Sequence, residues 1–483
     1  MLRFYFLIAI LFLPTFSNAQ GNFKKTRIDT QLGFISSTSK NTPFLSRSNQ
    51  YGLVPFESQV GFVSVSVRLE YDSLFTKSKK LKPFGFGYGF TPHINFGGKN
   101  QILIPEAYLK FRFKLFEIYA GRRREIQGLV DTLGTMGSYI WSGNALPLPK
   151  LEISIPNYTP IIGNGLVSMK GNFAHGWFGK GDSVQNVLLH QKSLYVKIGK
   201  PNWKIRMIGG FNHQVQWGGY PTKPFYDELS GQTISRFSSD FSSFIKVVTG
   251  VSLNRKGQGL NSGAPSNEAT NRAGNHLGTI DLGLEINPSN FDIRILIYRQ
   301  SIYDDGSLYY MNNISDGLWG FSFKLKDKII KNVCFEYLDS RNQGGAVNKS
   351  IPELRGIDNY FNNGIYQDSW VYKKRSLGNP LFYPERESEV GSNSNLNYIS
   401  NNRIQAINFN VTYNFSKILL VSQLIISHNL GTYQIPLNNT RSSIRNIAQY
   451  NWKLNNSLKI SLSNDISNTF IHGFDICYLR KLK

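Results

Sequence analysis

Apolar and polar side chains alternate along many segments of the chain, and this pattern predicts β-strands. The clearest examples are residues 63–71, 84–90, 107–115, 279–286 and 319–325. Successive side chains of a strand point to opposite faces of a sheet, so each segment has one apolar and one polar face. The segments are about ten residues long, which is the length that a tilted strand needs to cross a membrane.

Two architectures use an apolar sheet face of this kind. A secreted sandwich or propeller packs it against a protein core, whereas a membrane barrel turns it toward lipid and keeps the polar face in a wet lumen. Aromatic residues collect near the ends of the predicted strands, as they do at membrane interfaces. We therefore predict an all-β fold, a transmembrane antiparallel β-barrel that closes on itself because lipid offers no partners to open strand edges.

The first residues predict export. A positively charged start is followed by an apolar stretch over residues 4–16, and Ser17 and Ala19 are the small residues of a cleavage site. This combination is typical of a secretory signal peptide, which we place at residues 1–19, and the alternative is a buried N-terminal helix. Export brings the remaining residues, 20–483, to the cell outer membrane, where such barrels occur.

The connections between the predicted strands have two lengths. Short turns on one side and long loops on the other are typical of the periplasmic and extracellular sides of these barrels. The pattern predicts about 16–18 strands, with residues 341–401 as a long extracellular loop. Tight turns are expected at 287–290, 414–416 and 454–456, and the other long connections at 255–276, 301–316 and 429–446.

Residues 217–240 do not fit this scheme. Counting back from a periplasmic C-terminus, the strand that ends near Asn254 runs toward the outside, so residues 217–240 fall on the periplasmic side although they form a long segment. Either a strand has been missed, or a small helical or plug element is inserted there. The periplasmic insertion is the favoured prediction.

The amino-acid composition limits the partners and the kinds of metal or cofactor site that this chain can have. The chain has 483 residues, of which 14% are aromatic and 18% charged, and its 54 basic and 31 acidic residues give a formal charge of +23. Such a balance favours anionic partners. Because Cys334 and Cys477 are the only cysteines, a disulfide scaffold and a Cys-rich zinc or iron–sulfur domain are excluded, and we expect no metal and no cofactor.

Basic residues are the first candidate ligands of a polysaccharide. Arg122, Arg123 and Arg124 follow a long predicted strand, and guanidinium groups grip the carboxylates or phosphates of an anionic polymer. Lys110 and Arg112 share the strand face opposite the lipid-facing aromatics, which predicts a positive lumen wall. The alternative for the arginines is a charged ring at the membrane rim. Nucleic acid is not an expected partner in this compartment.

His213 and Trp217 are the second candidate site. Trp217 is followed by two glycines, and sugar rings often lie against such an aromatic ring while His, Asn and Gln side chains bond to the hydroxyls. The alternative is an interfacial tryptophan at a strand end. Catalytic signals are weak, because the seven histidines are scattered and neither H-E-x-x-H nor G-x-S-x-G occurs. We expect no enzyme activity, although a Ser–His pair assembled from distant strands keeps an outer-membrane hydrolase as a third hypothesis.

An ordered set of segments resembles a known family. Together the segments extend over most of the chain from about Asn49 onward, and the set is similar to the Wzi-like capsule assembly family in the form common among Gram-negative Bacteroidota. The matching segments are 137–145 (GSYIWSGNA), 189–195 (LHQKSLY), 210–219 ending in WGG, 298–300 (YRQ) with 304–306 (DDG), 316–320 (DGLWG) and 358–363 (DNYFNN).

The resemblance implies an outer-membrane barrel of about eighteen strands with a small helical element near its periplasmic end, which would suit residues 217–240. It also implies that the protein holds capsular polysaccharide at the cell surface, as a lectin and not as an enzyme. The chain departs from the usual barrel pattern at its end, where Tyr478 is followed by five further residues.

These observations together predict an outer-membrane protein that binds and organises capsular or exopolysaccharide through many weak contacts. The alternative hypothesis is a passive, porin-like solute channel. The basic lumen suggests an acidic polymer, and outer-membrane lipid and lipopolysaccharide are further expected partners. The sequence leaves the oligomeric state open.

Overall fold

The computed structural model describes residues 26–71, 83–228, 230–251, 253, 272–288, 292–304, 312–326, 329–346, 356–388, 395–452 and 455–482. The predicted signal peptide lies outside these residues and stays a prediction. Within them, no helix is long and apolar enough to cross a membrane.

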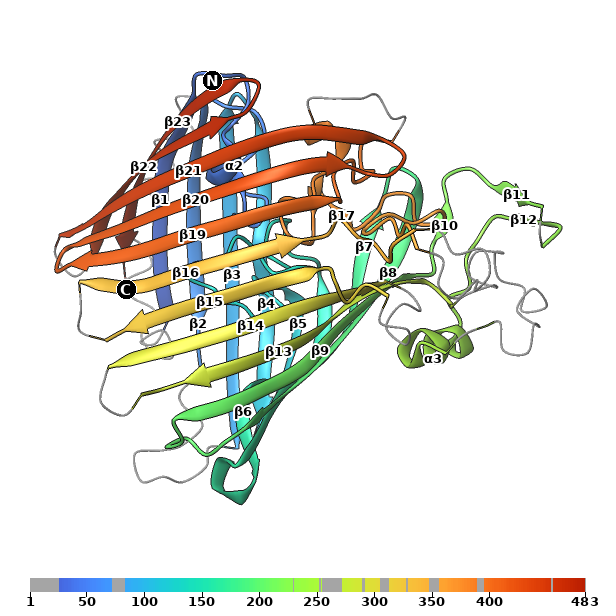
Figure 1. Cartoon of the computed structure of the whole chain (residues 1–483), viewed down its shortest axis with the longest axis horizontal. Helices are drawn as coiled ribbons and strands as arrows, with labels where there is room; N and C mark the ends of the chain where they lie inside the picture. Colours follow the sequence, from blue (N-terminus) through green and yellow to red (C-terminus); the bar gives the residue numbers. More distant parts are fainter. Residues whose placement is uncertain are drawn as a thin grey trace, which may run out of the picture.

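Eighteen antiparallel strands of the described chain form a closed barrel (Figure 1). Each strand pairs with its sequence neighbours, and β1 pairs with β23, from Asp29 opposite Lys481 to Ser37 opposite Gly473. The prediction of an all-β transmembrane barrel is confirmed. The barrel strands are β1 (Thr26–Ser37), β2 (Val60–Leu69), β3 (Phe84–Gly97), β4 (Gln101–Phe113), β5 (Phe116–Arg122), β6 (Lys150–Ile162), β7 (Val167–Lys180), β8 (Val184–Ile198), β9 (Ile205–Trp217), β13 (Asn275–Ile286), β14 (Ile293–Asp304), β15 (Gly317–Leu325), β16 (Ile330–Asp339), β19 (Ile404–Phe415), β20 (Ile418–Gly431), β21 (Pro436–Trp452), β22 (Asn456–Ile466) and β23 (Phe470–Lys481).

The alternation read from the sequence separates the two faces of the barrel wall. On β4, Phe111 is 44% exposed whereas the next residue, Arg112, is 3% exposed. The same change between neighbours recurs on β5 and β6, where Ile118 and Leu151 are exposed and Glu117 and Glu152 are buried. Apolar side chains therefore form the outer surface, and polar side chains line the lumen, as the lipid and water on the two sides require.

The two ends of the barrel differ. Both termini and short connections such as 114–115 and 416–417 lie at one end, which we call the turn end. The described residues of the long connections 38–59, 123–149, 218–274 and 340–403 lie at the other, which we call the loop end. Short periplasmic turns and long extracellular loops are the rule for such barrels, so the turn end faces the periplasm and the loop end the outside.

The prediction that residues 217–240 lie on the periplasmic side is wrong. The chain leaves β9 at the loop end, and Gln216 Nε2 donates to the carbonyl oxygen of Ser369, which belongs to the long connection 340–403. The strand count failed because residues that follow 240 form helix α3 (Phe241–Thr249) and not a strand. Asp240 caps this helix, and Gly250 ends it with a φ of 64°. The connection also contains β10 (Tyr220–Pro221), β11 (Phe225–Asp227) and β12 (Gln232–Ile234).

Three connections fold into the lumen at the loop end, and we call them the plug. They are residues 38–59 with helix α2 (Phe44–Arg47), residues 123–149, and residues 356–388 with β17 (Val371–Tyr372), β18 (Arg375–Ser376) and the 3₁₀ turn η7 (Glu385–Glu387). Their aromatic side chains pack on one another: the Tyr139 ring lies 5.1 Å from Phe382, which lies 4.6 Å from Phe361. These rings and Trp370 are fully buried, so the plug has a core of its own.

Polar side chains of the lumen wall hold the plug by its backbone. Glu336 of β16 accepts hydrogen bonds from the Met136 amide at 2.6 Å and from the Thr135 hydroxyl at 2.7 Å. Asp281 of β13 accepts from the Leu129 amide at 2.8 Å. Buried loop backbone needs such partners because water is excluded. The polar lumen wall thereby determines where the plug sits.

We expect the substitution Glu336→Leu to release residues 129–140 from the wall. It leaves the Met136 amide and the Thr135 hydroxyl without their acceptor, which costs about 2 kcal/mol or more for groups bound to a buried carboxylate. Hydrogen exchange at residues 129–140 in detergent should speed up accordingly. The matched control is Glu57→Gln at the exposed Glu57–Lys99 pair, where the expected loss stays below about 1 kcal/mol. Equal protection in both variants would contradict this role for Glu336.

Candidate functional site

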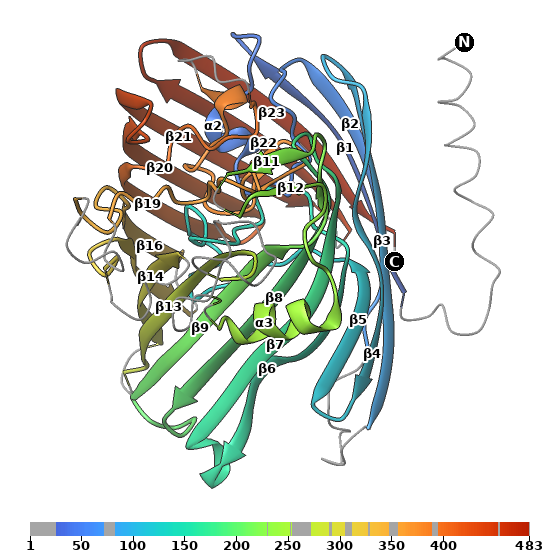
Figure 2. The same cartoon turned by 90° about the vertical axis from the view of Figure 1, so that its right-hand side faces the viewer.

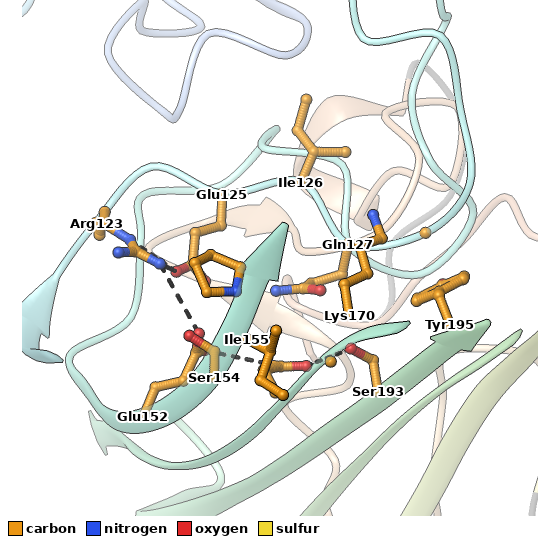
Figure 3. Close-up of a pocket in the computed structure, with 14 residues that line it drawn as sticks. Arg123, Glu125, Ile126, Gln127, Glu152, Ser154, Ile155, Lys170, Ser193 and Tyr195 are labelled. Carbon is orange, nitrogen blue, oxygen red and sulfur yellow. Dashed lines mark hydrogen bonds and ion pairs between the residues drawn. The ribbon is translucent and has the colours of Figure 1, made fainter. Parts of the chain in front are cut away.

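A cavity of about 190 Å³ opens in the lumen beneath the plug, and we call it the lumen cavity (Figure 3). Figure 3 shows Arg123 and Glu125, from the segment that follows β5, facing Glu152 of β6, while Lys170 of β7 and Tyr195 of β8 lie on the opposite side. The lining residues are Arg123, Glu125, Ile126, Gln127, Gly128, Glu152, Ser154, Ile155, Pro156, Lys170, Gly171, Asn172, Ser193 and Tyr195.

Arg123 is the central cation of this cavity, and it is paired. Its guanidinium contacts Glu117, lies 3.0 Å from Glu125 and 3.8 Å from Glu152, and covers the Tyr119 ring at 4.1 Å. Three carboxylates thus surround one guanidinium, which leaves little positive field for an anionic polymer. The arrangement ties the start of the plug to β5 and β6.

Glu125 stays ionised in this cluster. Burial by itself would raise the pKa of the carboxyl, but Lys150, whose Nζ lies 2.6 Å away, and Arg123 outweigh that effect and hold the pKa below its usual value. Lys150 is itself buried and also donates to Gln191 at 2.9 Å. A buried charge network of this kind fixes geometry, because removing one partner leaves another charge uncompensated.

The neighbouring arginines also point inward and not to the membrane rim. Arg122 Nη2 donates to the Tyr372 hydroxyl of the plug at 2.8 Å. Arg124 lies 3.9 Å from Glu106 and 5.4 Å from the Tyr51 ring. The side chains of Arg122, Arg123 and Arg124 therefore connect the barrel wall with two plug segments. Their assignment as polysaccharide ligands stays a prediction.

Lys110 and Arg112 lie on the lumen face, as the alternation on β4 predicts. Lys110 pairs with Glu70, and both cations lie over the Tyr71 ring, at 4.3 and 4.5 Å. This pair belongs to the turn end of the wall, because Glu70 and Tyr71 follow the end of β2 there. It is therefore separate from the arginine cluster near the plug.

His213 and Trp217 lie on the opposite side of the wall from these cations. Their side chains point outward from β9. Trp217 packs under helix α3 in a cluster with Val215, Val247 and Ala273, whereas the His213 ring lies beside His190 and His276. The Trp217 ring is 4% exposed, and His213 Nε2 lies 3.0 Å from His276 Nδ1. A sugar ring has no access to the Trp217 face in this arrangement, and the structure does not bring the two predicted sites together.

A groove at the loop end was missed in the sequence. It has a volume of about 180 Å³ and lies between the β7–β8 turn and the plug, and we call it the plug groove. Lys373 and Lys374 extend from it in left-handed backbone conformations, with φ of 47° and 72°. The Asp368 carboxylate accepts from the amides of Ser183 and Val184, both at 2.9 Å. The adjacent Tyr–Lys–Lys of the loop was the sequence signal that could have indicated it.

A second loop-end pocket of about 780 Å³ lies beside β16, β19 and β20, and we call it the rim pocket. The Arg403 guanidinium covers the Tyr433 ring at 3.9 Å, and Arg341 pairs with Asp339 at 2.7 Å. Arg403 therefore supplies a cation that covers an aromatic ring, whereas Arg341 is paired with a carboxylate. Within the described ranges, no group of three or more His, Cys, Asp or Glu side chains is placed to hold a metal ion.

A closed barrel with an apolar outer surface, a polar lumen and a plug made of its own loops is an outer-membrane barrel of the self-occluded type. The family model of the capsule assembly protein Wzi matches residues 30–464, so the chain belongs to the Wzi capsule assembly family. The protein is accordingly a protein of the outer membrane, and the family resemblance read from its sequence segments is confirmed.

Two solved structures are similar to this chain, and the first of them has the same barrel fold. One is Wzi of Escherichia coli, an outer-membrane protein involved in group 1 capsule assembly and described as a carbohydrate-binding β-barrel. The TM-score is 0.58 at 13% identity, over 93% of this chain and 83% of that one. Another is OccAB4 of Acinetobacter baumannii, with a TM-score of 0.46 at 7% identity over 94% and 97% of the two chains. A search of curated protein sequences gives no match.

We expect the plug to respond to pH through Asp316, which lies at the rim pocket in the connection before β15. Burial raises the pKa of this carboxyl to about 6, although it accepts from the Gln343 amide and the Tyr360 hydroxyl. The folded state therefore holds the proton more tightly than the unfolded state, and stability falls as the pH rises from about 4 through about 6. The fall should reach at most about 3 kcal/mol.

The measurement is urea unfolding in detergent at pH 4.5 and pH 7. The variant Asp316→Asn should lose most of this pH-dependent difference, whereas Asp292→Asn at the exposed turn end should keep it. The same pH dependence in wild type and Asp316→Asn would show that another group is responsible.

Proposed function

We propose that this protein binds capsular polysaccharide at its loop end and holds it on the cell surface without catalysing a reaction. The observation that carries the proposal is the placement of the plug groove and the rim pocket, both charged and aromatic, on the extracellular end of a barrel whose lumen is occupied there by the plug. The carbohydrate binding of the Escherichia coli relative, which has the same fold, is consistent with it.

The chemistry of the plug groove suits an acidic polymer. Lys180, Lys373 and Lys374 supply three exposed cations, while the carboxylates of Asp182 and Asp368 are engaged with Asn397 and with backbone amides of the β7–β8 turn. Each contact contributes little, but a polymer that occupies both loop-end sites gains by avidity. The polymer is thus bound by a surface at the outside and not by a tunnel.

Arg122 and Arg123, which the sequence analysis singled out, hold the plug segments that form the plug groove. Arg122 holds the Tyr372 hydroxyl at the floor of the plug groove, and Arg123 fixes the segment that starts the plug. We propose that Arg122 positions the groove and that Arg123, Arg124, Lys110 and Arg112 stabilise the wall and the plug. His213 and Trp217 are proposed to hold helix α3.

The alternative hypothesis of a passive channel predicts open conductance. In planar bilayers we expect no steady conductance from the wild type, because the plug core packs across the lumen at the loop end. Replacing residues 128–147 with a short Gly–Ser linker removes part of the plug core and should produce conductance. The barrel should remain closed, because β5 and β6 still pair directly at Gly121 and Lys150. Steady conductance of the wild type would favour the channel, and labelling by a serine-reactive probe would favour a hydrolase.

The binding proposal is tested in a deletion strain that carries each variant. Lys373→Gln combined with Lys374→Gln should leave total polysaccharide unchanged but move a several-fold larger share into the medium, because two groove cations are lost. The matched control removes two exposed cations at the turn end, Lys200→Gln with Lys204→Gln, and should retain polymer as the wild type does.

Correct insertion of each variant is verified by heat-modifiable migration on gels. Unchanged retention by the inserted groove variant would contradict the assignment of Lys373 and Lys374. Unchanged surface polysaccharide in the deletion strain itself would contradict the function.

A further inference from the structure

Helix α3 lies on the outside of the barrel wall. Figure 2 shows it across the outer side of β7, β8 and β9. The Phe244 ring lies 5.7 Å from Trp217, 6.1 Å from His190 and 6.2 Å from His175, three side chains that point outward from β9, β8 and β7. The helix therefore covers the lipid-facing surface of three strands and does not close the lumen.

Burial changes abruptly along these strands. Under the helix, the outward side chains His190, His213 and Trp217 are buried. Nearer the turn end, outward side chains of the same strands return to the apolar band: Leu194 of β8 is 37% exposed and Met207 of β9 is 58% exposed. Helix α3 thus marks the extracellular edge of the surface that faces lipid acyl chains.

The helix shows an apolar stripe of its own away from the wall. Phe244 and Val247 pack on the barrel, whereas Phe241 is 77% exposed and Ile245 is 45% exposed. Phe241 and Ile245 are four residues apart and so lie on one stripe of the helix. In water this stripe would be unfavourable, but at the edge of the apolar band it lies next to acyl chains. The exposed Trp177, whose ring is 5.1 Å from His175, is an aromatic side chain of the kind that occupies membrane interfaces.

Cations gather at the C-terminal turn of the helix. Lys192 of β8 donates to the Val248 carbonyl, and Arg272 Nε donates to the Gly250 carbonyl at 2.8 Å. Lys246 lies on the helix itself within the same turn. Three positive groups therefore lie at the C-terminal end of a helix that also carries an apolar stripe, a combination that complements a lipid with a phosphorylated headgroup.

We propose that helix α3 is an interfacial helix and that it docks a phosphorylated glycolipid of the outer leaflet, the lipid A part of lipopolysaccharide. Phe241 and Ile245 insert among the acyl chains, while Lys192, Lys246 and Arg272 bind a phosphate of the headgroup. The proposal does not depend on capsule binding, because this site lies on the outer wall and the plug groove lies at the loop end.

The position of the helix is tested with a fluorophore that reports water. In a background in which Cys334 and Cys477 are replaced by serine, Ile245→Cys carries the label, and Ser242→Cys on the adjacent polar stripe carries it in a matched protein. After reconstitution into bilayers, the label at 245 should shift to shorter wavelength and be quenched by spin-labelled acyl chains more strongly than the label at 242. A water-like spectrum and no quenching at 245 would overturn the interfacial helix.

The headgroup site is tested by native mass spectrometry of the full-length protein extracted from phosphatidylcholine bilayers that contain either lipid A or phosphatidylglycerol. The wild type should retain lipid A in preference to phosphatidylglycerol. Replacing Lys192, Lys246 and Arg272 with glutamine should weaken retention by about fivefold for each cation removed. The control Lys200→Gln with Lys204→Gln should retain lipid A as the wild type does.

Equal retention of the two lipids by the wild type would overturn the glycolipid assignment, and equal retention by the triple variant would overturn the cation site. Both assays use purified protein without capsule. Their failure therefore leaves the polysaccharide proposal untouched, and loss of capsule retention in the groove variant leaves the helix proposal untouched.

Discussion

The structure depends on one constraint, which is that backbone amides and carbonyls must find partners where water is excluded. In lipid, the strands meet this requirement only by closing the sheet, and β1 does so by pairing with β23 over nine residues. The same constraint acts a second time inside the barrel, where irregular loop backbone is buried. Glu336 and Asp281 of the wall supply acceptors to the plug amides. The lumen is therefore polar because it holds a folded plug, and not only because water fills its open part.

The two proposed binding sites, the plug groove and the rim pocket, lie at the loop end of the barrel. Cations that a sequence suggests as polymer ligands are used to hold the plug, as the contacts of Arg123 with three glutamates illustrate. Lys373 and Lys374, two exposed cations at the loop end, belong to a segment of the plug itself. The plug thus both occludes the lumen at the loop end and positions the proposed binding groove.

The barrel wall also separates groups that are close in sequence. Neighbouring residues of β9 alternate between lumen and outside, so Gln216 reaches the plug while Trp217 packs beneath α3. The outer wall is apolar toward the turn end and is covered by a helix at the loop end. Side chains of the single strand β9 therefore contact the plug on one face. On the other face they form part of the apolar outer surface and pack against helix α3.

The sequence by itself determined the barrel, because period-2 alternation and strand length are local properties that lipid makes decisive. It also determined that Lys110 and Arg112 face the lumen, since one register of β4 sends its aromatics outward. It could not give the side of the membrane on which residues 217–240 lie, because residues 241–249 have the apolar content of a strand and were counted as one. They form a helix through the Asp240 cap, the Gly250 end and packing on Trp217.

The candidate site was only partly predictable for the same reason. Whether Arg123 meets a polymer or three carboxylates depends on Glu117, Glu125 and Glu152, which the strand pairing brings together. The plug groove combines the β7–β8 turn with a loop nearly two hundred residues later, held by Asp368 on the amides of Ser183 and Val184. Local patterns determine which face of the barrel wall a side chain takes. Contacts between distant loops decide which charged side chains remain unpaired, and the free energy of these contacts is gained only once the barrel has closed.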